Sequence, residues 1–301
     1  MTAAMHGILL VDKPEGLTSA AVVARVKRGL RLGKVAKVGH LGTLDPFATG
    51  LLPICLGEAT KLAQFLAAEA KRYVGEIVLG VSTDTLDRTG TVVETRPVPV
   101  LTPSAIAAAL GGLRGPIMQT PPMYSALKRD GVPLYRLARQ GQEVERPARA
   151  VAVTAFDVAV TAPDRLAFAV ACSKGTYVRV LAQDLGTALG TVAHVSALRR
   201  TEFGPFGLAE AVPLDRVEEL AGQGTLPVVT LSAAMMRYRA VVADAGLITA
   251  IRHGRQQALG ALGAPRATAE VVRIESADGV LVAVAEAAGE AGWRLARVMG
   301  S

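Results

Sequence analysis

Short apolar segments with strand-like alternation, separated by glycine and proline turns, constrain the fold of this chain most. The alternation predicts strands over residues 8–12, 73–81, 91–94, 150–160 and 165–172. Apolar residues at helical spacing predict helices over residues 19–30, 103–110 and 178–189. Because strands and helices do not alternate regularly and their connections are long, the pattern favours a mixed α+β domain over a repeating βαβ sheet.

The length of the chain and a change in its local composition predict two domains. A chain of 301 residues is about twice the usual size of one domain. The stretch LAGQGTLPVVTL, residues 220–231, is the best candidate for a junction. We therefore predict one domain over residues 1–230 and a small, mostly β domain over residues 231–301. The second domain is expected to hold a helix over 243–252 and strands over 269–276, 279–286 and 293–298.

Composition excludes several classes of protein. With 33 basic and 26 acidic residues the formal net charge is +7, which favours an anionic partner such as nucleic acid. Cys55 and Cys172 are far apart in apolar surroundings, so a disulfide scaffold is not expected. The four histidines are scattered without metal-ligand spacing, so no metal site is expected. No long apolar run or signal-like start is present, which predicts a soluble cytoplasmic protein.

A run of positive charge precedes the most distinctive loop of the chain. Between Gly16 and Leu44 there are six basic residues and no acidic one. They are Arg25, Lys27, Arg28, Arg31, Lys34 and Lys37. The run indicates either a solvated helix face or a surface that faces phosphate groups, since a one-signed run adds a salt-sensitive attraction for a polyanion.

The segment GHLGTLDPFATGLL, residues 39–52, carries the strongest chemical signal. Three glycines punctuate it, and the Asp45-Pro46 pair holds Asp45 in an extended conformation before a turn. Asp45 could simply cap the segment 47–52, and His40 could be a loop histidine bonded to the backbone. A carboxylate on a glycine-rich loop next to a basic run can instead act as a nucleophile if it stays ionised.

Six blocks of the chain together resemble one known family. They are GILLVDKPEGLTS, GHLGTLDPFATGLLPICLGEATK, KRYVGEIVLGVSTDTLDRTG, QTPPMYSALKRDGVPLYRLARQG, CSKGTYVRVLAQDLG and AHVSALRRTEFGPF. In this order, over about residues 7–215, they resemble the bacterial TruB-type tRNA pseudouridine synthases. The C-terminal segment resembles a PUA-type RNA-binding module. The resemblance implies a mixed, largely antiparallel catalytic sheet of the pseudouridine synthase type, followed by a small PUA-like β domain.

The resemblance also implies a reaction. A uridine in the T loop of tRNA, position 55, becomes pseudouridine when its N1–C1′ bond breaks, the uracil rotates and C5 rejoins C1′. By motif position Asp45 would be the catalytic aspartate, and Arg179 would pair with it and lower its pKa. Tyr73, the third residue assigned to catalysis, would stack on the base, and moving a proton is a second role that the resemblance leaves open for it. Three routes stay open for Asp45: addition to C1′, addition to C6, or elimination across C1′–C2′.

Other matched positions imply contacts with the RNA. Tyr177 and Leu198 would enclose the base, and His40 would pack under the splayed loop, because flipping a base out needs compensating contacts. Positive residues are tentative contacts of the RNA backbone. They are Lys13, Arg25, Arg28, Lys34 and Lys61. Lys13 and Lys61 could instead belong simply to the neighbourhood of Asp45.

The resemblance leaves the partners partly open. The product is an isomer of the substrate, so no cofactor is expected. We expect the T arm of tRNA as partner, with no membrane and no obligate protein or guide RNA. The alternatives are the guide-RNA-dependent branch of the same superfamily, a non-enzymatic RNA binder, and an unrelated small-molecule enzyme in which the basic run has no use. The insert over residues 119–141 favours the stand-alone form.

Overall fold

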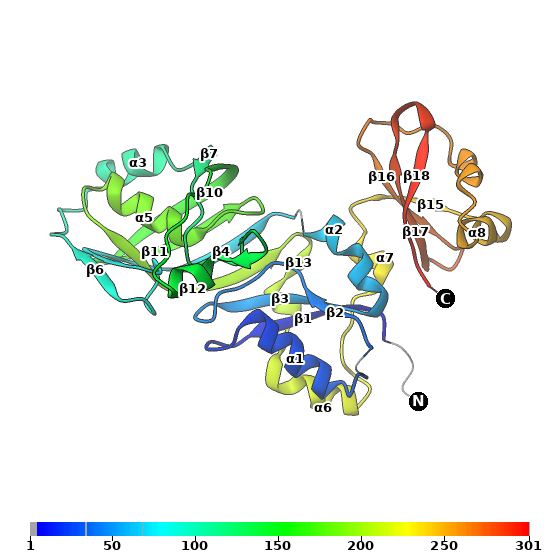
Figure 1. Cartoon of the computed structure of the whole chain (residues 1–301), viewed down its shortest axis with the longest axis horizontal. Coiled ribbons are helices and arrows are strands. Elements are labelled where there is room, and N and C mark those ends of the chain that lie inside the picture. The colour runs from blue at the N-terminus through cyan, green and yellow to red at the C-terminus, as the bar shows by residue number, and fades with distance from the viewer. Residues whose placement is uncertain (1–4, 34, 68, 301) are drawn as a thin grey trace.

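The chain folds into a large part built on one broad sheet and a smaller strand-rich part at its C-terminal end (Figure 1). The computed structural model describes residues 5–33, 35–67 and 69–300. Lys34, a tentative contact of the RNA backbone, lies outside the described residues.

The large sheet is mixed and mostly antiparallel. Its strand order is β14-β1-β3-β12-β4-β11-β10-β7, with β2 added on β3 and β13 on β12. Only the pairs β1/β14 and β3/β12 are parallel. The strands are β1 (Gly7–Lys13), β2 (Val38–His40), β3 (Thr49–Leu56), β4 (Lys71–Leu79), β7 (Gly115–Gln119), β10 (Arg149–Ala162), β11 (Arg165–Cys172), β12 (Ala193–Phe203), β13 (Phe206–Gly207) and β14 (Val212–Pro213). The predicted fold class is confirmed.

Helices start where the sequence provides caps. The side chains of Thr18 and Thr102 accept hydrogen bonds from the backbone amides of Ala21 and Ala105, as the sequence predicts. The helices are α1 (Ser19–Gly29), α2 (Ala63–Leu66), α3 (Pro103–Gly111), α4 (Leu134–Arg139), α5 (Val178–Ala188), α6 (Val217–Gly222), α7 (Leu231–Ala234) and α8 (Ala245–Arg252). Two hairpins are added, β5 (Val81–Thr83) with β6 (Val92–Thr95) and β8 (Lys128–Arg129) with β9 (Val132–Pro133). None of the described helices is long and apolar enough to cross a membrane.

The C-terminal part is a four-stranded sheet in the order β15-β16-β17-β18. Its strands are β15 (Arg239–Val242), β16 (Val271–Glu275), β17 (Leu281–Ala287) and β18 (Trp293–Val298). A buried apolar cluster that includes Ile251, Val272 and Trp293 joins this sheet to α8. The predicted strand-rich C-terminal segment is therefore present.

A second apolar cluster joins the two parts of the molecule. Leu51 and Phe203 of the large sheet are buried in it together with Met235, Leu281 and Val284. Polar contacts run alongside this cluster between the 3₁₀ segment Gly57–Leu62 and the end of the chain. The two parts therefore share a core across the predicted junction.

Two central strands were missed by the sequence pattern. Residues 47–52, considered as a capped segment, run instead into β3, and β12 lies between β3 and β4. β12 carries His194, Arg199, Arg200 and Glu202, which do not follow the alternation of a buried strand. The fold buries Arg200 completely by giving it carbonyl partners on other segments, which a pattern of local hydropathy cannot reveal.

Candidate active site

Asp45 lies on the loop between β2 and β3, and the start of the chain fixes that loop. The Ser19 hydroxyl, at the first turn of α1, donates to Leu44 O (3.0 Å) and accepts from Leu44 N (2.9 Å). The Lys13 ammonium donates to the carbonyls of Pro46 (3.1 Å) and Ala48 (2.6 Å). Side chains of β1 and α1 therefore hold the backbone on both sides of Asp45 by hydrogen bonds.

Of the two roles left open for Lys13, this arrangement favours the one beside Asp45 over a contact with the RNA backbone. Its side chain is 0% exposed, and its three donors are directed at backbone carbonyls. Burial lowers its pKa to about 8, against the opposing attraction of Asp45. Lys13 thus positions the Asp45 loop and has no surface to offer a phosphate.

Glycines border the loop where side chains have no room. Gly42 has φ +69°, and a Cβ there would lie 3.0 Å from the ring of Phe203. Gly50 has φ +97°, and a Cβ there would lie 2.3 Å from the carbonyl oxygen of Arg200. Both positions favour glycine because of the left-handed backbone and the close approach of β12.

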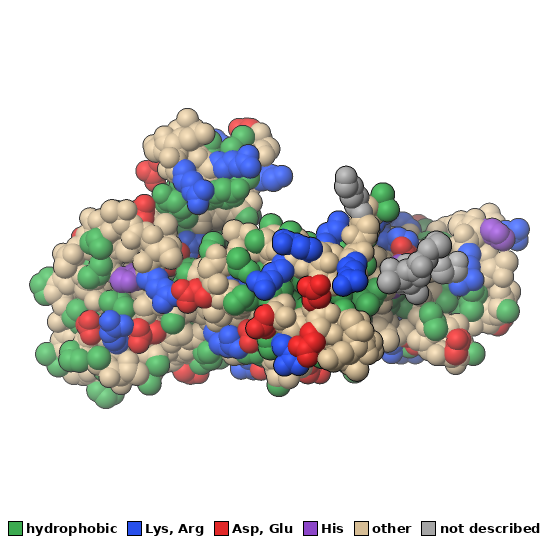
Figure 2. Space-filling model, turned by 90° about the horizontal axis from the view of Figure 1, so that it is seen from below, with side chains coloured by type: hydrophobic (Ala, Val, Ile, Leu, Met, Phe, Trp, Pro, Cys, Tyr) green, Lys and Arg blue, Asp and Glu red, His purple; other side chains and the backbone are tan. Residues whose placement is uncertain are grey.

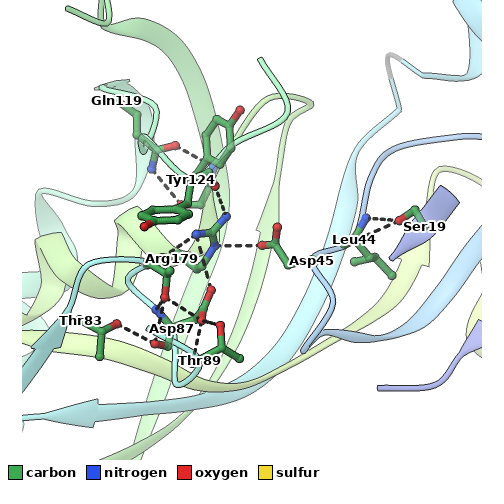
Figure 3. A network of polar contacts seen from close by, with 11 residues as sticks. Ser19, Leu44, Asp45, Thr83, Asp87, Thr89, Gln119, Tyr124 and Arg179 are labelled. Carbon is green, nitrogen blue, oxygen red and sulfur yellow. Dashed lines mark hydrogen bonds and ion pairs between the residues drawn. The ribbon is translucent and has the colours of Figure 1, made fainter. Parts of the chain in front are cut away.

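Arg179 connects three segments at the site (Figure 3). Its Nε lies 2.9 Å from Asp45 Oδ2. Its terminal nitrogens donate to the carbonyls of Thr85 (2.5 Å) and Tyr124 (2.8 Å). The side chain is only 4% exposed, since it lies in the first turn of α5 beneath these loops. Arg179 therefore has a single, fully determined orientation toward Asp45.

A second carboxylate, Asp87, which lies in a matched block of the sequence but was given no role there, supports Arg179. Asp87 Oδ2 lies 3.6 Å from Arg179 Nη1. Asp87 itself is buried and accepts hydrogen bonds from the hydroxyls of Thr85 (2.9 Å) and Thr89 (2.5 Å). The Asp-Arg-Thr-Gly turn at 87–90 was the signal in the sequence that could have indicated it.

The environment of Asp45 acts on its pKa in opposing directions. Burial raises the pKa from the ordinary value of 3.8, and the nearby Asp87 adds to the rise. The ion pair with Arg179 and the charge of Lys13 oppose it. The net direction is upward, whereas the expectation from sequence considered only the arginine. The Asp45 side chain is still 34% exposed, so it can meet a substrate.

The carboxylates of this site are arranged around Arg179 and not around a metal ion. Asp45 and Asp87 both contact the guanidinium, which occupies the place between them. Within the described parts of the chain, no three His, Cys, Asp or Glu side chains are grouped to hold a metal.

A cavity of about 330 Å³ opens beside Asp45. Tyr73 from β4, Tyr177 before α5 and Leu198 from β12 line it together with Asp45 and Arg179. Gln119 fixes Tyr177 by accepting from its amide (2.7 Å) and donating to its carbonyl (3.2 Å). Aromatic and apolar walls with one carboxylate at the edge suit a planar, weakly polar ring such as a nucleobase.

The structure places His40 on the other side of Asp45. It lines an adjoining hollow of about 720 Å³ that Asp45 and Arg179 also border, but not the cavity with Tyr73. Burial, with Arg200 adding to it, lowers the pKa of His40. His40 lies beside Asp45 but outside the cavity that Tyr73 lines.

The tentative contacts of the RNA backbone fall into two groups. Arg25 and Arg28 are exposed on α1. Basic and acidic side chains are interspersed over the face of the molecule that Figure 2 shows. In the hollow that Arg25 lines, Asp12 is paired with Arg199 at 2.6 Å, and Asp215 is the other acidic residue. Lys61 is turned inward: its ammonium contacts Glu58 Oε2 (2.5 Å) and donates to the carbonyl of Val298 (2.8 Å). This side chain therefore links the large part to β18; it is still 31% exposed, and its tentative contact with RNA stays a prediction.

The fold defines the class of protein to which this site belongs. The chain is similar to a solved structure titled "Crystal Structure of a Cbf5-Nop10-Gar1 Complex", with a TM-score of 0.72, 26% identity, and coverage of 97% of this chain and 84% of that one. It is also similar to "Structure of H/ACA RNP bound to a substrate RNA containing 2'-deoxyuridine", with a TM-score of 0.68, 25% identity, and coverage of 94% and 78%. Fold and site together are those of an enzyme that acts as a pseudouridine synthase.

Sequence comparison then gives the family. A protein of Burkholderia pseudomallei (strain 668) named tRNA pseudouridine synthase B is 46% identical over 287 residues, which is 94% of each chain. One of the same name from Stutzerimonas stutzeri (strain A1501) is 50% identical over 220 residues, 73% of this chain and 71% of the other. The model of the TruB family pseudouridylate synthase N-terminal domain matches residues 28–178, and that of the tRNA pseudouridylate synthase B C-terminal domain matches residues 179–236. The chain belongs to the TruB family of pseudouridylate synthases and is an isomerase.

Proposed function

We propose that this enzyme converts the uridine at position 55, in the T loop of tRNA, to pseudouridine, with Asp45 as the catalytic carboxylate. The names of the relatives support tRNA as the substrate. The observation that carries the proposal is the partly exposed Asp45 carboxylate, held by buried Arg179 at the edge of a cavity of the size of a base.

The site residues divide the work of the reaction. Arg179 orients the Asp45 carboxylate toward the cavity and keeps a positive charge against it, so that it ionises in spite of burial. In that state Asp45 can add to C1′, add to C6, or take part in elimination across C1′–C2′; all three routes require the carboxylate at the edge of the ribose and base. Tyr73, Tyr177 and Leu198 enclose the uracil while it rotates.

The enclosure also accounts for base flipping. Extruding a nucleotide from a stacked loop costs about a few kcal/mol, which the pocket must offset with stacking and apolar contacts. The two tyrosines and Leu198 provide such contacts. His40, beside the opening, is suited to support the loop from which the base has left.

The enzyme is proposed to work alone in the cytoplasm, without a guide RNA or a protein partner. The insert over residues 119–141 contributes to the site itself, since Tyr124 O accepts from Arg179 and Gln119 holds Tyr177. The C-terminal sheet, predicted to be PUA-like over residues 231–301, would add contacts with the RNA outside the T loop.

Incubation of the purified chain with an unmodified tRNA transcript tests this proposal. Mapping of pseudouridine is expected to show one modified site, at position 55, without any added protein or RNA. A transcript with cytidine at that position is the matched control and should stay unmodified. Product at another uridine would change the substrate assignment, and product only after a partner is added would exclude the stand-alone form.

A further inference from the structure

Two buried cations line the base cavity and have been given no part in the reaction so far. Lys71 on β4 is 7% exposed, and Arg200 on β12 is 0% exposed; both line the cavity. In the register of the sheet Arg200 is opposite Tyr73, and Lys71 is opposite Phe203. We call Lys71 and Arg200 the cationic pair.

The two charges converge on one place. Lys71 Nζ lies 4.4 Å and Arg200 Cζ lies 5.3 Å from the centre of the Phe203 ring. A Cβ on Gly42, in the loop of Asp45, would lie 3.4 Å from Arg200 Nη1 and 3.7 Å from Lys71 Cε. The cationic pair therefore forms the floor of the cavity beside the loop that carries Asp45.

The partners of the cationic pair are neutral. Lys71 donates to the carbonyls of Ala67 (3.2 Å) and Glu69. Arg200 donates to the carbonyls of Leu51 (2.7 Å) and Gly42 (3.1 Å). In the described parts of the chain neither forms an ion pair with a carboxylate.

This differs from Arg179, whose charge is matched by two carboxylates. Asp45 and Asp87 together more than neutralise the one guanidinium. The cationic pair thus leaves an unmatched positive potential at the floor of the same cavity, beside the Asp45 loop. Buried cations normally have a counter-charge, so an unmatched pair indicates an anion that is present only during part of the reaction.

We propose that the cationic pair stabilises the negative charge that the base acquires when its bond to the ribose breaks. The inference rests on the proposed function, because it needs a uracil in this cavity. Fixed charges aimed at the place where charge develops lower the barrier without reorganising during the step.

The bond changes place that charge on the base. When N1–C1′ breaks, its electron pair stays on the uracil, and C1′ is satisfied by the Asp45 carboxylate or by loss of the C2′ proton. The detached uracil is an anion while it rotates. C5 then bonds to C1′ as the Asp45 carboxylate leaves it or, after elimination, as C2′ regains its proton. C5 loses its proton and N1 gains one, so atoms and electrons balance. If Asp45 adds to C6 instead, the base still carries the negative charge, as an enolate.

Lys71 allows a test that separates charge from packing. Lys71→Met keeps a side chain over Phe203 but removes the charge, and Lys71→Arg keeps the charge. At saturating tRNA, Lys71→Met is expected to lower the single-turnover rate by about a hundredfold to a thousandfold, the range for the loss of one preorganised donor. The affinity for tRNA should not change, and Lys71→Arg should restore most of the rate. A loss of affinity at an unchanged rate would overturn the proposal in favour of a phosphate contact.

A leaving base of different acidity separates an electrostatic role of Lys71 from a purely structural one. 5-Fluorouracil is a stronger acid than uracil, so its anion needs less stabilisation. With 5-fluorouridine at the target position, the rate at which the N-glycoside is lost should depend less on Lys71→Met than it does with uridine. An equal defect on both substrates would overturn the electrostatic role, even if the variant is slow.

The dependence of the reaction rate on pH, at alkaline pH, also tests the charge of Lys71. Burial and the neighbouring Arg200 lower the pKa of Lys71 to about 8. The groups around it are Arg200 on β12, Cys172 at the end of β11, Lys174 after it, and Glu69, which Arg237 pairs. The rate should fall above about pH 8 in the parent enzyme, and this fall should move to higher pH in Lys71→Arg. An alkaline limb that is the same in both would contradict the proposal.

Arg72→Met is the matched control. Arg72 is the next residue on β4, exposed on the other face of the strand and paired with Glu202 at 2.9 Å. Its loss should leave the single-turnover rate unchanged. A parent enzyme without pseudouridine product would refute the proposed function itself, whereas an active parent with an equally active Lys71→Met would refute only the role of the cationic pair.

Discussion

At the scale of single residues, Asp45 depends on the groups that surround it. Burial opposes its ionisation, while Arg179 and Lys13 favour it. Ser19 and Lys13 fix the backbone on which the carboxylate stands. Its chemistry is thus determined by residues from β1, α1 and α5 as much as by the loop itself.

Replacement of Asp45 by Asn should abolish turnover and leave the affinity for tRNA within roughly a few-fold. The change removes the charge that the chemistry needs and preserves the shape. Product is measured by tritium release from C5-labelled uridine, and binding by filter retention. Turnover near the parental rate would refute the role of Asp45.

The same variant has an expected effect on stability. The pKa of Asp45 is higher in the folded chain than its ordinary value of 3.8, so ionisation of this group costs folding free energy as the pH rises through that window. Asp45→Asn should therefore be at least as stable as the parent at neutral pH, and any gain should disappear in acid. Urea unfolding at several pH values measures this. A large loss of stability at neutral pH would show that the contact with Arg179 outweighs burial.

The raised pKa also predicts the acid limb of the reaction. The single-turnover rate should fall tenfold per pH unit once Asp45 becomes protonated, starting above the pH at which an ordinary aspartate would titrate. Rates at saturating tRNA from pH 4 upward, on an RNA whose folding is checked at each pH, give the profile. A midpoint at or below 3.8 would contradict the upward direction.

Arg179→Lys tests the orientation of Asp45. A lysine keeps the charge but cannot make the same set of contacts with Asp45, Thr85 O and Tyr124 O. Loss of one charged hydrogen bond costs about 1.5–3 kcal/mol, so the rate should fall by about 10- to 150-fold. Single-turnover kinetics at saturating tRNA measures the effect. A parental rate would show that charge alone is enough.

At the scale of elements, the single helix α1 has two functions. Its first turn holds the Asp45 loop through Ser19, and its exposed side carries Arg25 and Arg28. In the hollow beside Arg25, Asp12 is already paired with Arg199 at 2.6 Å, and Asp215 is the other acidic residue. The contribution of α1 to RNA binding is therefore a question of individual contacts.

The double variant Arg25→Gln, Arg28→Gln should weaken tRNA binding and flatten its salt dependence. For a duplex the slope of log affinity against log salt changes by about 0.9 per lost phosphate contact, so a change of about 2 is expected if both residues touch the T arm. Titrations at several salt concentrations measure the slope. The rate at saturating tRNA should stay the same, because these residues do not reach the base.

A second double variant controls for net charge. Arg96 and Arg114 are exposed and paired with Glu94 and Asp157. Their replacement by Gln changes the net charge equally and should leave the slope unchanged. If both double variants give the parental slope, α1 is a solvated helix face and the RNA binds elsewhere.

At the scale of the whole molecule, the two parts are not independent. The cluster with Phe203, Met235 and Leu281 runs through the predicted junction, and Lys61 ties the large part to β18. A chain that ends at residue 230 would leave this apolar surface open to water. The C-terminal sheet therefore supports the large part, in addition to any contacts that it makes with RNA.

Met235→Ala tests this coupling. Met235 is 0% exposed, and truncation of a buried methionine to alanine costs about 2–5 kcal/mol. We expect the whole chain to unfold in a single thermal transition at a lower temperature than the parent. At low temperature the variant should keep its catalytic activity. Calorimetry measures it, and Met236→Ala, at the exposed neighbouring position, is the control. Two separate transitions, with only that of the C-terminal part shifted to lower temperature, would show that the two parts fold independently.

The sequence predicted those features whose causes are local. Thr18 and Thr102 cap their helices because a side-chain oxygen reaches an amide three residues on. The alternation in β11 gives its predicted bounds, since burial on a sheet follows a period of two. The Asp45 block was recognised because its residues are consecutive. These signals span only a few residues.

Features that depend on distant segments were decided by the tertiary structure. The sequence presents Lys13, Lys61 and Arg25 alike as positive charges, but the fold buries the first, pairs the second and exposes the third. It also turns Arg200, on a strand that the pattern missed, into the floor of the cavity. The free energy of a charge depends on burial and on partners that the chain brings from far away, so a linear sequence determines which charges exist, and only packing determines which of them can meet a substrate.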